Sequence, residues 1–88
     1  MTTVASQFKI KAQEINAKMA ELLKESRAEE RYTMRALSEK LGMPHSFIGK
    51  TEQQNRRLDV GEFIQYCHAL EADPVVIFKS LVKAANAT

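Results

Sequence analysis

The sequence is poor in glycine, proline, cysteine and tryptophan. Its 88 residues include three glycines, two prolines, one cysteine and no tryptophan. Because turn-rich all-β folds place glycine and proline at many turns, this scarcity favours an all-α fold. The single Cys67 cannot form a disulfide within the chain, which indicates a reducing compartment. The length suits one domain, residues 1–88, and excludes the large enzyme barrels.

Residues that carry enzyme chemistry are also scarce. The two histidines, His45 and His68, and the lone cysteine are too few for a metal cluster or a nucleophile–base pair. The three glycines, Gly42, Gly49 and Gly61, lack the spacing of a phosphate-binding loop. We therefore expect no enzymatic activity, no cofactor and no metal site.

Long apolar runs and a leader segment are lacking as well. The longest apolar run, residues 75–78, is far shorter than the ~18 residues of a membrane span. Residues 1–5 do not show the charged and then apolar pattern of a signal peptide. These observations predict a protein of the cytoplasm.

The most regular feature that is present is helical periodicity near the N-terminus. Spacings that alternate between four and three residues predict an amphipathic helix over residues 7–29. A coiled-coil dimer has a similar pattern, although about three heptads are marginal for one. The predicted buried face consists of Phe8, Ala12, Ile15, Met19, Leu22 and Ser26.

Capping residues mark four shorter helices farther along the chain. Thr33, Asp59 and Asp73 are predicted N-caps, and Asp59 has the spacing of a capping box with the glutamate three residues later. Gly42 is predicted to end one helix, and Pro44 to occupy the first position of the next. The predicted helices span residues 34–41, 44–52, 60–70 and 74–85.

The last two predicted helices are rich in apolar residues, and the fifth carries more of them than a small bundle can bury. In the fourth, the predicted buried face is Val60, Phe63, Ile64, Cys67 and Leu70. In the fifth, the surplus apolar surface predicts a symmetric dimer interface. That interface is predicted to contain Val75, Val76, Phe78, Leu81 and Val82.

The net charge of +2 is unevenly distributed along the chain. Five cations and two anions give residues 32–57 a charge of +3, whereas two cations and four anions give residues 58–88 a charge of −2. A basic centre indicates an anionic partner. Within it, the helices over 34–41 and 44–52 are joined by a glycine turn, which is the helix-turn-helix pattern. Helix corners that bind nothing can show the same pattern.

The residues of this helix pair, TMRALSEKLGMPHSFIGKTE (33–52), resemble the phage-repressor/Cro-like (XRE) helix-turn-helix family. The stretch NRRLDV (55–60) and residues 62–63 and 66–70 look like a bacterial branch of it. The resemblance covers residues 24–78 and leaves 1–23 as an N-terminal helical extension. It implies a five-helix bundle of the lambda-repressor-like type. It also implies a sequence-specific, nucleoid-associated regulator that binds double-stranded DNA, commonly as a homodimer on a palindromic operator.

The resemblance also implies roles for individual residues. Side chains at the base-contact positions can donate to or accept from base edges, and the cations can neutralise phosphates. Arg27 and Glu52 match a structural ion pair. The implied base contacts are His45, Ser46, Gly49 and Lys50. The expected backbone contacts are Thr33, Arg35, Asn55, Arg56 and Arg57.

Some residues depart from the pattern of the family. Met34 replaces a glutamine that grips a phosphate, Thr51 replaces an aliphatic residue and Leu58 replaces a frequent proline. Residues 53–54 lack the usual glycine, so we expect Asn55 to adopt the left-handed conformation there.

Two functional hypotheses follow. The first is a homodimeric repressor. The alternative is an antitoxin or another interaction module that binds a protein partner, such as a toxin, as well as DNA. The unexplained residues 1–23 and the apolar fifth helix motivate this alternative. For each implied base contact, an ordinary solvated or neutral surface residue is the competing interpretation.

Overall fold

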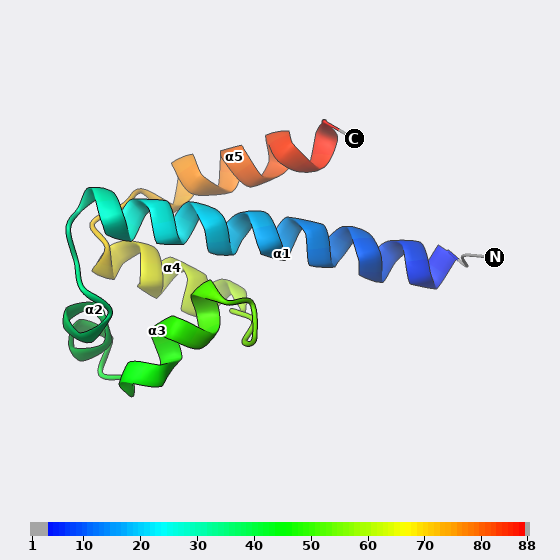
Figure 1. Cartoon of the computed structure of the whole chain (residues 1–88). Helices are drawn as coiled ribbons and strands as arrows, with labels where there is room; N and C mark the ends of the chain where they lie inside the picture. The colour runs from blue at the N-terminus through cyan, green and yellow to red at the C-terminus, as the bar shows by residue number, and fades with distance from the viewer. Residues whose placement is uncertain (1–3, 88) are drawn as a thin grey trace.

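The computed structural model describes residues 4–87, and within this range all regular secondary structure is helical (Figure 1). This confirms the all-α prediction. The second helix begins and ends at the predicted residues, and the last three helices begin within one residue of their predicted starts. The helices are α1 (Val4–Glu29), α2 (Met34–Leu41), α3 (His45–Glu52), α4 (Val60–Ala69) and α5 (Pro74–Asn86).

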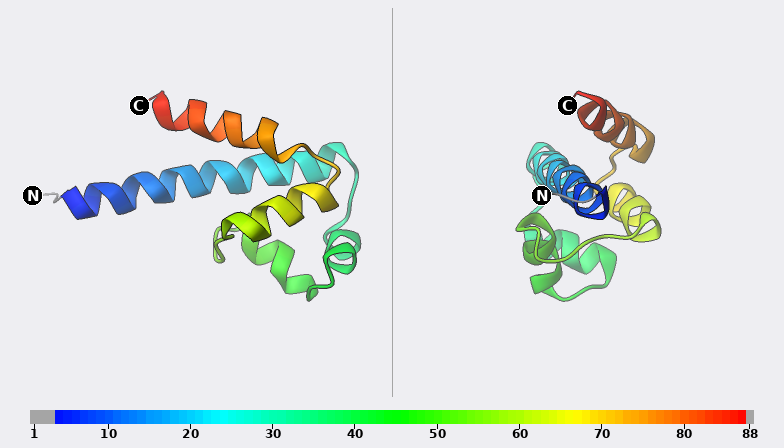
Figure 2. Two further views of the ribbon diagram at one scale, coloured as in Figure 1. Left: turned by 180° about the vertical axis from the view of Figure 1, so that it is seen from behind. Right: turned by 90° about the vertical axis from the view of Figure 1, so that its right-hand side faces the viewer.

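Helix α1 is longer than predicted and extends beyond the bundle. It begins at Val4, three residues before the predicted start at residue 7. Figures 1 and 2 show α5 running beside α1 and ending before the first turns of α1. Every side chain from residue 6 to residue 10 is exposed. We call residues 4–10 the N-terminal arm.

The arm explains why Phe8 does not belong to the core. Its side chain is 75% exposed, although it continues the predicted apolar face of α1. Farther along α1, Met19 is buried, and Leu23, which the spacing did not select, is fully buried. The apolar face of a helix is buried only where another element lies against it, and α1 meets α3 and α5 beyond its first turns.

The core joins α1 to the other helices. Of the face predicted for α4, Phe63, Cys67 and Leu70 are buried in it, but the other two predictions are wrong. Val60 is 75% exposed because it lies in the first turn of α4, beyond the packed region. Ile64 is 39% exposed because it lies about 100° around the helix from Phe63. The fully or almost fully buried large residues include Leu23, Leu37, Ile48, Tyr66, Cys67 and Leu70.

Helix α5 divides its apolar residues between the core and the surface. Ile77 and Leu81 are buried. The prediction that Leu81 belongs to a dimer interface is therefore wrong: it lies one helical turn after Ile77 and packs into the core of its own chain. The exposed apolar residues of α5 are Val75, Val76, Phe78 and Val82. We call these four residues the α5 patch.

Local hydrogen bonds explain the helix ends. Thr33 Oγ1 accepts from the Ala36 amide at 3.0 Å, and Gly42 adopts the left-handed conformation (φ 67°) after α2. Asp59 and Glu62 form the predicted capping box, with hydrogen bonds of 2.8 and 2.9 Å.

The end of α3 differs from the prediction. Gln54, and not Asn55, has positive φ (64°). The Asn55 amide donates to the Lys50 carbonyl at 2.8 Å, and the Gln54 amide donates to the Thr51 carbonyl at 3.2 Å. These two hydrogen bonds form a Schellman motif, in which the residue that follows the C-cap must be left-handed. Because the C-cap is Gln53, that residue is Gln54.

Candidate nucleic-acid interface

Helix α3 presents one face to the core and the other to solvent. Phe47, Ile48 and Thr51 are buried. The Thr51 hydroxyl donates to the Phe47 carbonyl at 2.8 Å, so this buried polar group is satisfied where the family usually has an aliphatic residue. Packing on this side leaves the opposite side of α3 available for contact with another molecule.

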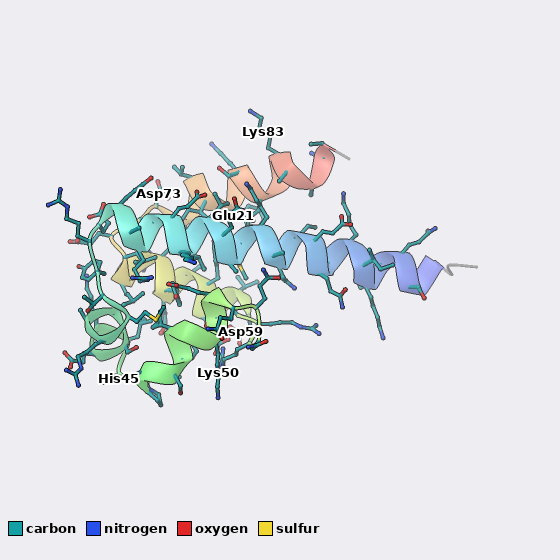
Figure 3. The ribbon with its side chains drawn as sticks, viewed as in Figure 1. Glu21, His45, Lys50, Asp59, Asp73 and Lys83 are labelled. Carbon is teal, nitrogen blue, oxygen red and sulfur yellow. The ribbon has the colours of Figure 1, made fainter. Side chains whose placement is uncertain are left out.

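The four implied base-contact residues lie together on that opposite side. His45, Ser46 and Lys50 are exposed, and Gly49 is half-buried. Their spacing of one, four and five residues places them on neighbouring turns of one helix face. Figure 3 shows Lys50 pointing away from the bundle and His45 at the first turn of α3. The face therefore offers an imidazole, a hydroxyl and an ammonium group around a glycine.

Gly49 is not required by the fold of the chain. It adopts an ordinary helical conformation, and a Cβ atom placed on it would meet no atom within 4 Å. Glycine inside a helix costs about 1 kcal/mol relative to alanine. We therefore expect Gly49→Ala to raise the free energy of unfolding by about 0.5–1 kcal/mol, as measured by urea denaturation. Destabilisation by this substitution would contradict the open space seen around Gly49.

The expected backbone-contact residues lie on either side of α3. Thr33 and Arg35 are exposed at the start of α2, and Asn55 and Arg57 are exposed in the loop after α3. The hydroxyl of Thr33 is already used as the helix cap. Among residues 4–87, no hydrogen bond or ion pair is seen for the guanidinium groups of Arg35 and Arg57. Both cations are thus free to meet an anion.

Arg56 differs from its neighbour Arg57 because its guanidinium is occupied. It donates to both carboxylate oxygens of Glu62, at 2.7 and 3.3 Å, and to the Arg57 carbonyl at 3.0 Å. It also lies 4.6 Å from the centre of the Phe47 ring, a cation–π distance. Arg56 therefore ties the loop to α3 and α4. Sequence reasoning missed this role because helical spacing does not show how the loop turns, and it is the turn of the loop that brings Arg56 against Glu62 and the Phe47 ring.

The Arg56–Glu62 pair makes stability depend on pH. Hydrogen bonds from Arg56 and from the Asp59 amide hold the pKa of Glu62 below its ordinary value of 4.5. A lowered pKa in the folded state stabilises the protein above pH ~4.5, and this contribution is lost as the pH falls through the folded-state pKa. We expect wild type to be more stable than Glu62→Gln at pH 7 and to lose this advantage in acid. Urea denaturation between pH 3 and 7 measures it, and a constant difference would contradict the prediction.

Arg27 and Glu52 form an ion pair that holds α3 against α1. Arg27 Nε and Nη2 donate to the two carboxylate oxygens of Glu52 at 2.5 and 3.1 Å, and Arg27 Nη1 donates to the Tyr32 carbonyl at 2.8 Å. The side chains are 16% and 3% exposed, respectively. This bidentate contact fixes the last turn of α3, and with it the orientation of the outward face.

The structure assigns no chemistry to Cys67. The thiol is fully buried, and burial raises its pKa to about 11. His68, beside it, is exposed.

Within residues 4–87, no group of three histidine, cysteine, aspartate or glutamate side chains is close enough to hold a metal ion. None of the helices in this range is sufficiently long and apolar to span a membrane.

Comparison with known proteins identifies this arrangement. An XRE-family like protein from Pseudomonas syringae pv. tomato str. DC3000 is 33% identical, with a TM-score of 0.80, and the match covers 93% of this chain and 98% of that one. The restriction-modification controller protein C.Esp1396I is 26% identical, with a TM-score of 0.71, over 78% of this chain and 91% of its own. A tyrosine-to-phenylalanine mutant of that controller matches similarly, at 27% identity and a TM-score of 0.71 over 80% and 89% of the two chains.

No family model matches the chain, and no curated protein is significantly similar to it. The similarity to the Pseudomonas protein nevertheless extends over nearly the whole of both chains. Its description agrees with the resemblance carried by residues 33–52 and with the five-helix fold. The chain therefore belongs to the XRE family of helix-turn-helix DNA-binding transcription regulators.

Proposed function

We propose that the protein is a homodimeric repressor that inserts α3 into the major groove of a palindromic operator. The outward face of α3 carries this proposal. It combines three polar side chains with a glycine that the chain itself does not need. Lys50 reads guanine O6 and N7, and His45 and Ser46 read neighbouring base edges. At Gly49 the helix backbone approaches the bases closely.

Two unpaired arginines and the N-terminus of α2 hold the protein on the DNA phosphates. Arg35 and Arg57 neutralise backbone phosphates on either side of α3, and Thr33 and Asn55 lie beside the same backbone. Arg56, which is engaged with Glu62, holds the loop that carries Arg57. These contacts give affinity without sequence information, whereas the face of α3 supplies the sequence preference.

The α5 patch is proposed to join the two subunits. Figure 3 shows Lys83 and Lys50 pointing to opposite sides of the molecule. Val82 lies about 100° and Phe78 about 140° around α5 from Lys83, so these two residues of the patch are turned sideways relative to the DNA face, whereas Val76 lies on the side of Lys83. A sideways two-fold contact lets both α3 helices face one duplex about 34 Å apart, which is one DNA turn. The low net charge of +2 also favours two subunits acting together.

A DNA-binding titration tests the proposal. Duplexes are selected from random and genomic pools, including the region upstream of the protein's own gene, and binding is followed by fluorescence anisotropy at several salt concentrations. We expect salt-sensitive binding to a two-fold symmetric site and a dimer mass by sedimentation equilibrium. Absence of binding to any selected duplex, or a monomer mass at micromolar concentration, would overturn the proposal. Lower DNA affinity of Gly49→Ala, alongside its higher stability, would support close approach at this position.

A second candidate function is that of an antitoxin or a related module. It is favoured by the exposed α5 patch, which a protein partner can cover in place of a second copy. Co-expression of the protein with the genes that neighbour its own, followed by purification of the protein, distinguishes the two functions. A stable 1:1 complex with a neighbouring gene product would favour the antitoxin, and a homodimer alone would favour the repressor.

A further inference from the structure

A closed network of hydrogen bonds lies where the loop after α3 meets α4. Arg56 Nη2 donates to Glu62 Oε2 at 2.7 Å, and Arg56 Nη1 donates to Glu62 Oε1 at 3.3 Å. Arg56 Nη1 also donates to the Arg57 carbonyl at 3.0 Å, and Glu62 Oε1 also accepts from the Asp59 amide at 2.9 Å. The carboxylate of Glu62 therefore joins the two arginines of the loop to the first turn of α4.

The charge of Glu62 is directed at Arg56. The side chains of Arg56 and Glu62 are 35% and 34% exposed, and the contact between them is bidentate. An acidic residue beside a DNA-binding surface ordinarily weakens binding, because it repels the phosphates. Here a cation lies directly against the carboxylate, so the two opposite charges largely cancel at longer range. Glu62 can therefore lie beside the loop without strongly opposing DNA.

Helix α3 does not depend on this network for its position. The Arg27–Glu52 ion pair fixes its last turn, and the Phe47 ring is 7% exposed in the core. The Arg56 guanidinium lies 4.6 Å from the centre of that ring, so the ring gives it a rigid surface. The loop is less constrained, since Arg57 and residues 53–55 are exposed. Loss of the network should therefore loosen the loop and leave α3 in place.

We propose that Glu62 is a positioning residue that strengthens DNA binding through Arg57. The inference rests on the proposed function and deepens it. By holding Arg56 against the Phe47 ring, Glu62 fixes the backbone of Arg57, whose carbonyl belongs to the network. The Arg57 side chain then extends from a fixed point, so less conformational freedom is lost when it meets a phosphate. Glu62 thereby raises affinity for DNA, although its charge has the same sign as that of DNA.

Two substitutions break the network in different ways. In Glu62→Gln the amide oxygen can still accept from the Asp59 amide, so the capping box is kept, but the amide nitrogen cannot accept from Arg56. Arg56→Lys keeps the positive charge and loses the planar group that donates to several partners at once. The control is Glu25→Gln, which removes the same charge as Glu62→Gln from an exposed position of α1.

Fluorescence anisotropy titrations over a range of salt concentrations measure the effect. The probe is a fluorescein-labelled duplex selected with the wild-type protein. We expect Glu62→Gln and Arg56→Lys to bind about two- to tenfold more weakly than wild type, with an unchanged salt slope. Glu25→Gln should bind at least as tightly as wild type, because it removes only a repulsive charge.

A double-substitution cycle connects the effect to Arg57. If Glu62 acts through Arg57, Glu62→Gln should have little further effect in a protein that already carries Arg57→Ala. It should keep its full effect beside Lys50→Ala, because Lys50 lies on α3, which the network does not position. A loss of stability alone would not produce this difference. Circular dichroism at the assay temperature checks that each variant has wild-type helicity.

Other outcomes overturn either this proposal or the one beneath it. Tighter binding of Glu62→Gln, with a salt slope steeper by about one unit, would overturn it and show that the released Arg56 contacts a phosphate. An equal effect of Glu62→Gln with and without Arg57→Ala would also overturn it. In both cases DNA binding by the wild-type protein stands. If wild type binds no selected duplex at all, the proposed function itself fails.

Discussion

Replacement of Arg27 by methionine is expected to lower the free energy of unfolding by about 3–5 kcal/mol. The substitution leaves the carboxylate of Glu52, which is 3% exposed, buried without its cation. It also removes the hydrogen bond to the Tyr32 carbonyl, which holds the connection between α1 and α2. A buried charge that loses its partner pays the cost of desolvation with no compensating attraction. Urea denaturation followed by circular dichroism measures the loss.

Two controls make this prediction specific. Lys18→Met removes an exposed ion pair with Glu21, in which the side chains are 40% and 57% exposed, and should change stability by less than about 0.5 kcal/mol. The double substitution Arg27→Met with Glu52→Leu removes both charges and should recover part of the loss. If Arg27→Met lies within about 1 kcal/mol of wild type, the pair does not hold α3 in place.

Substitution of Lys50 by alanine is expected to reduce discrimination between operator sequences by about 1–3 kcal/mol, or roughly 5- to 150-fold in relative affinity. Lys50 is exposed on the outward face of α3, where its ammonium group can donate to both acceptors of a guanine. The loss should be concentrated at one base pair of each half-site. Competition between the operator and duplexes with single base changes measures it.

Arg57→Ala provides the contrast. Removal of a phosphate contact should weaken binding to all duplexes similarly and lower the salt slope by about one unit. Sequence reasoning assigned this behaviour to Arg56 as well, but the guanidinium of Arg56 is held by Glu62 and by the Phe47 ring. We therefore expect Arg56→Ala to act mainly on the loop. Equal loss of discrimination from Lys50→Ala and Arg57→Ala would refute the division of roles.

Helix boundaries in this protein follow from short-range rules. Thr33, Gly42, Asp59 and Asp73 each end or begin a helix through hydrogen bonds and backbone conformations within a few residues. The sequence therefore predicted α2, and the starts of the next three helices, closely. Two of these predictions are wrong by one residue: Pro44 is the N-cap of α3 and not its first residue, and the left-handed residue is Gln54 and not Asn55. The position of the left-handed residue depends on where α3 ends, and one residue moves the whole motif.

The candidate site was predictable to the extent that it depends on spacing. Positions 45, 46, 49 and 50 share a face in any α-helix, so the sequence and the resemblance together indicated the outward face of α3. The interactions of each charged residue were not predictable in this way. Arg56 and Arg57 are adjacent in the chain, yet one is paired and the other is free, because only Arg56 reaches Glu62 and the Phe47 ring.

The composition of the chain and the local spacing of its residues were sufficient to predict an all-α domain, its capped helices and its helix-turn-helix. Burial was decided by packing, because a side chain is buried only if another element lies opposite it. Leu81 and Val82 are neighbours with similar side chains, but Leu81 enters the core and Val82 joins the α5 patch. Phe8 continues the apolar face of α1 and yet is 75% exposed, because it belongs to the first turns of α1, which extend past the end of α5. The exposed arm arises from that difference in helix length.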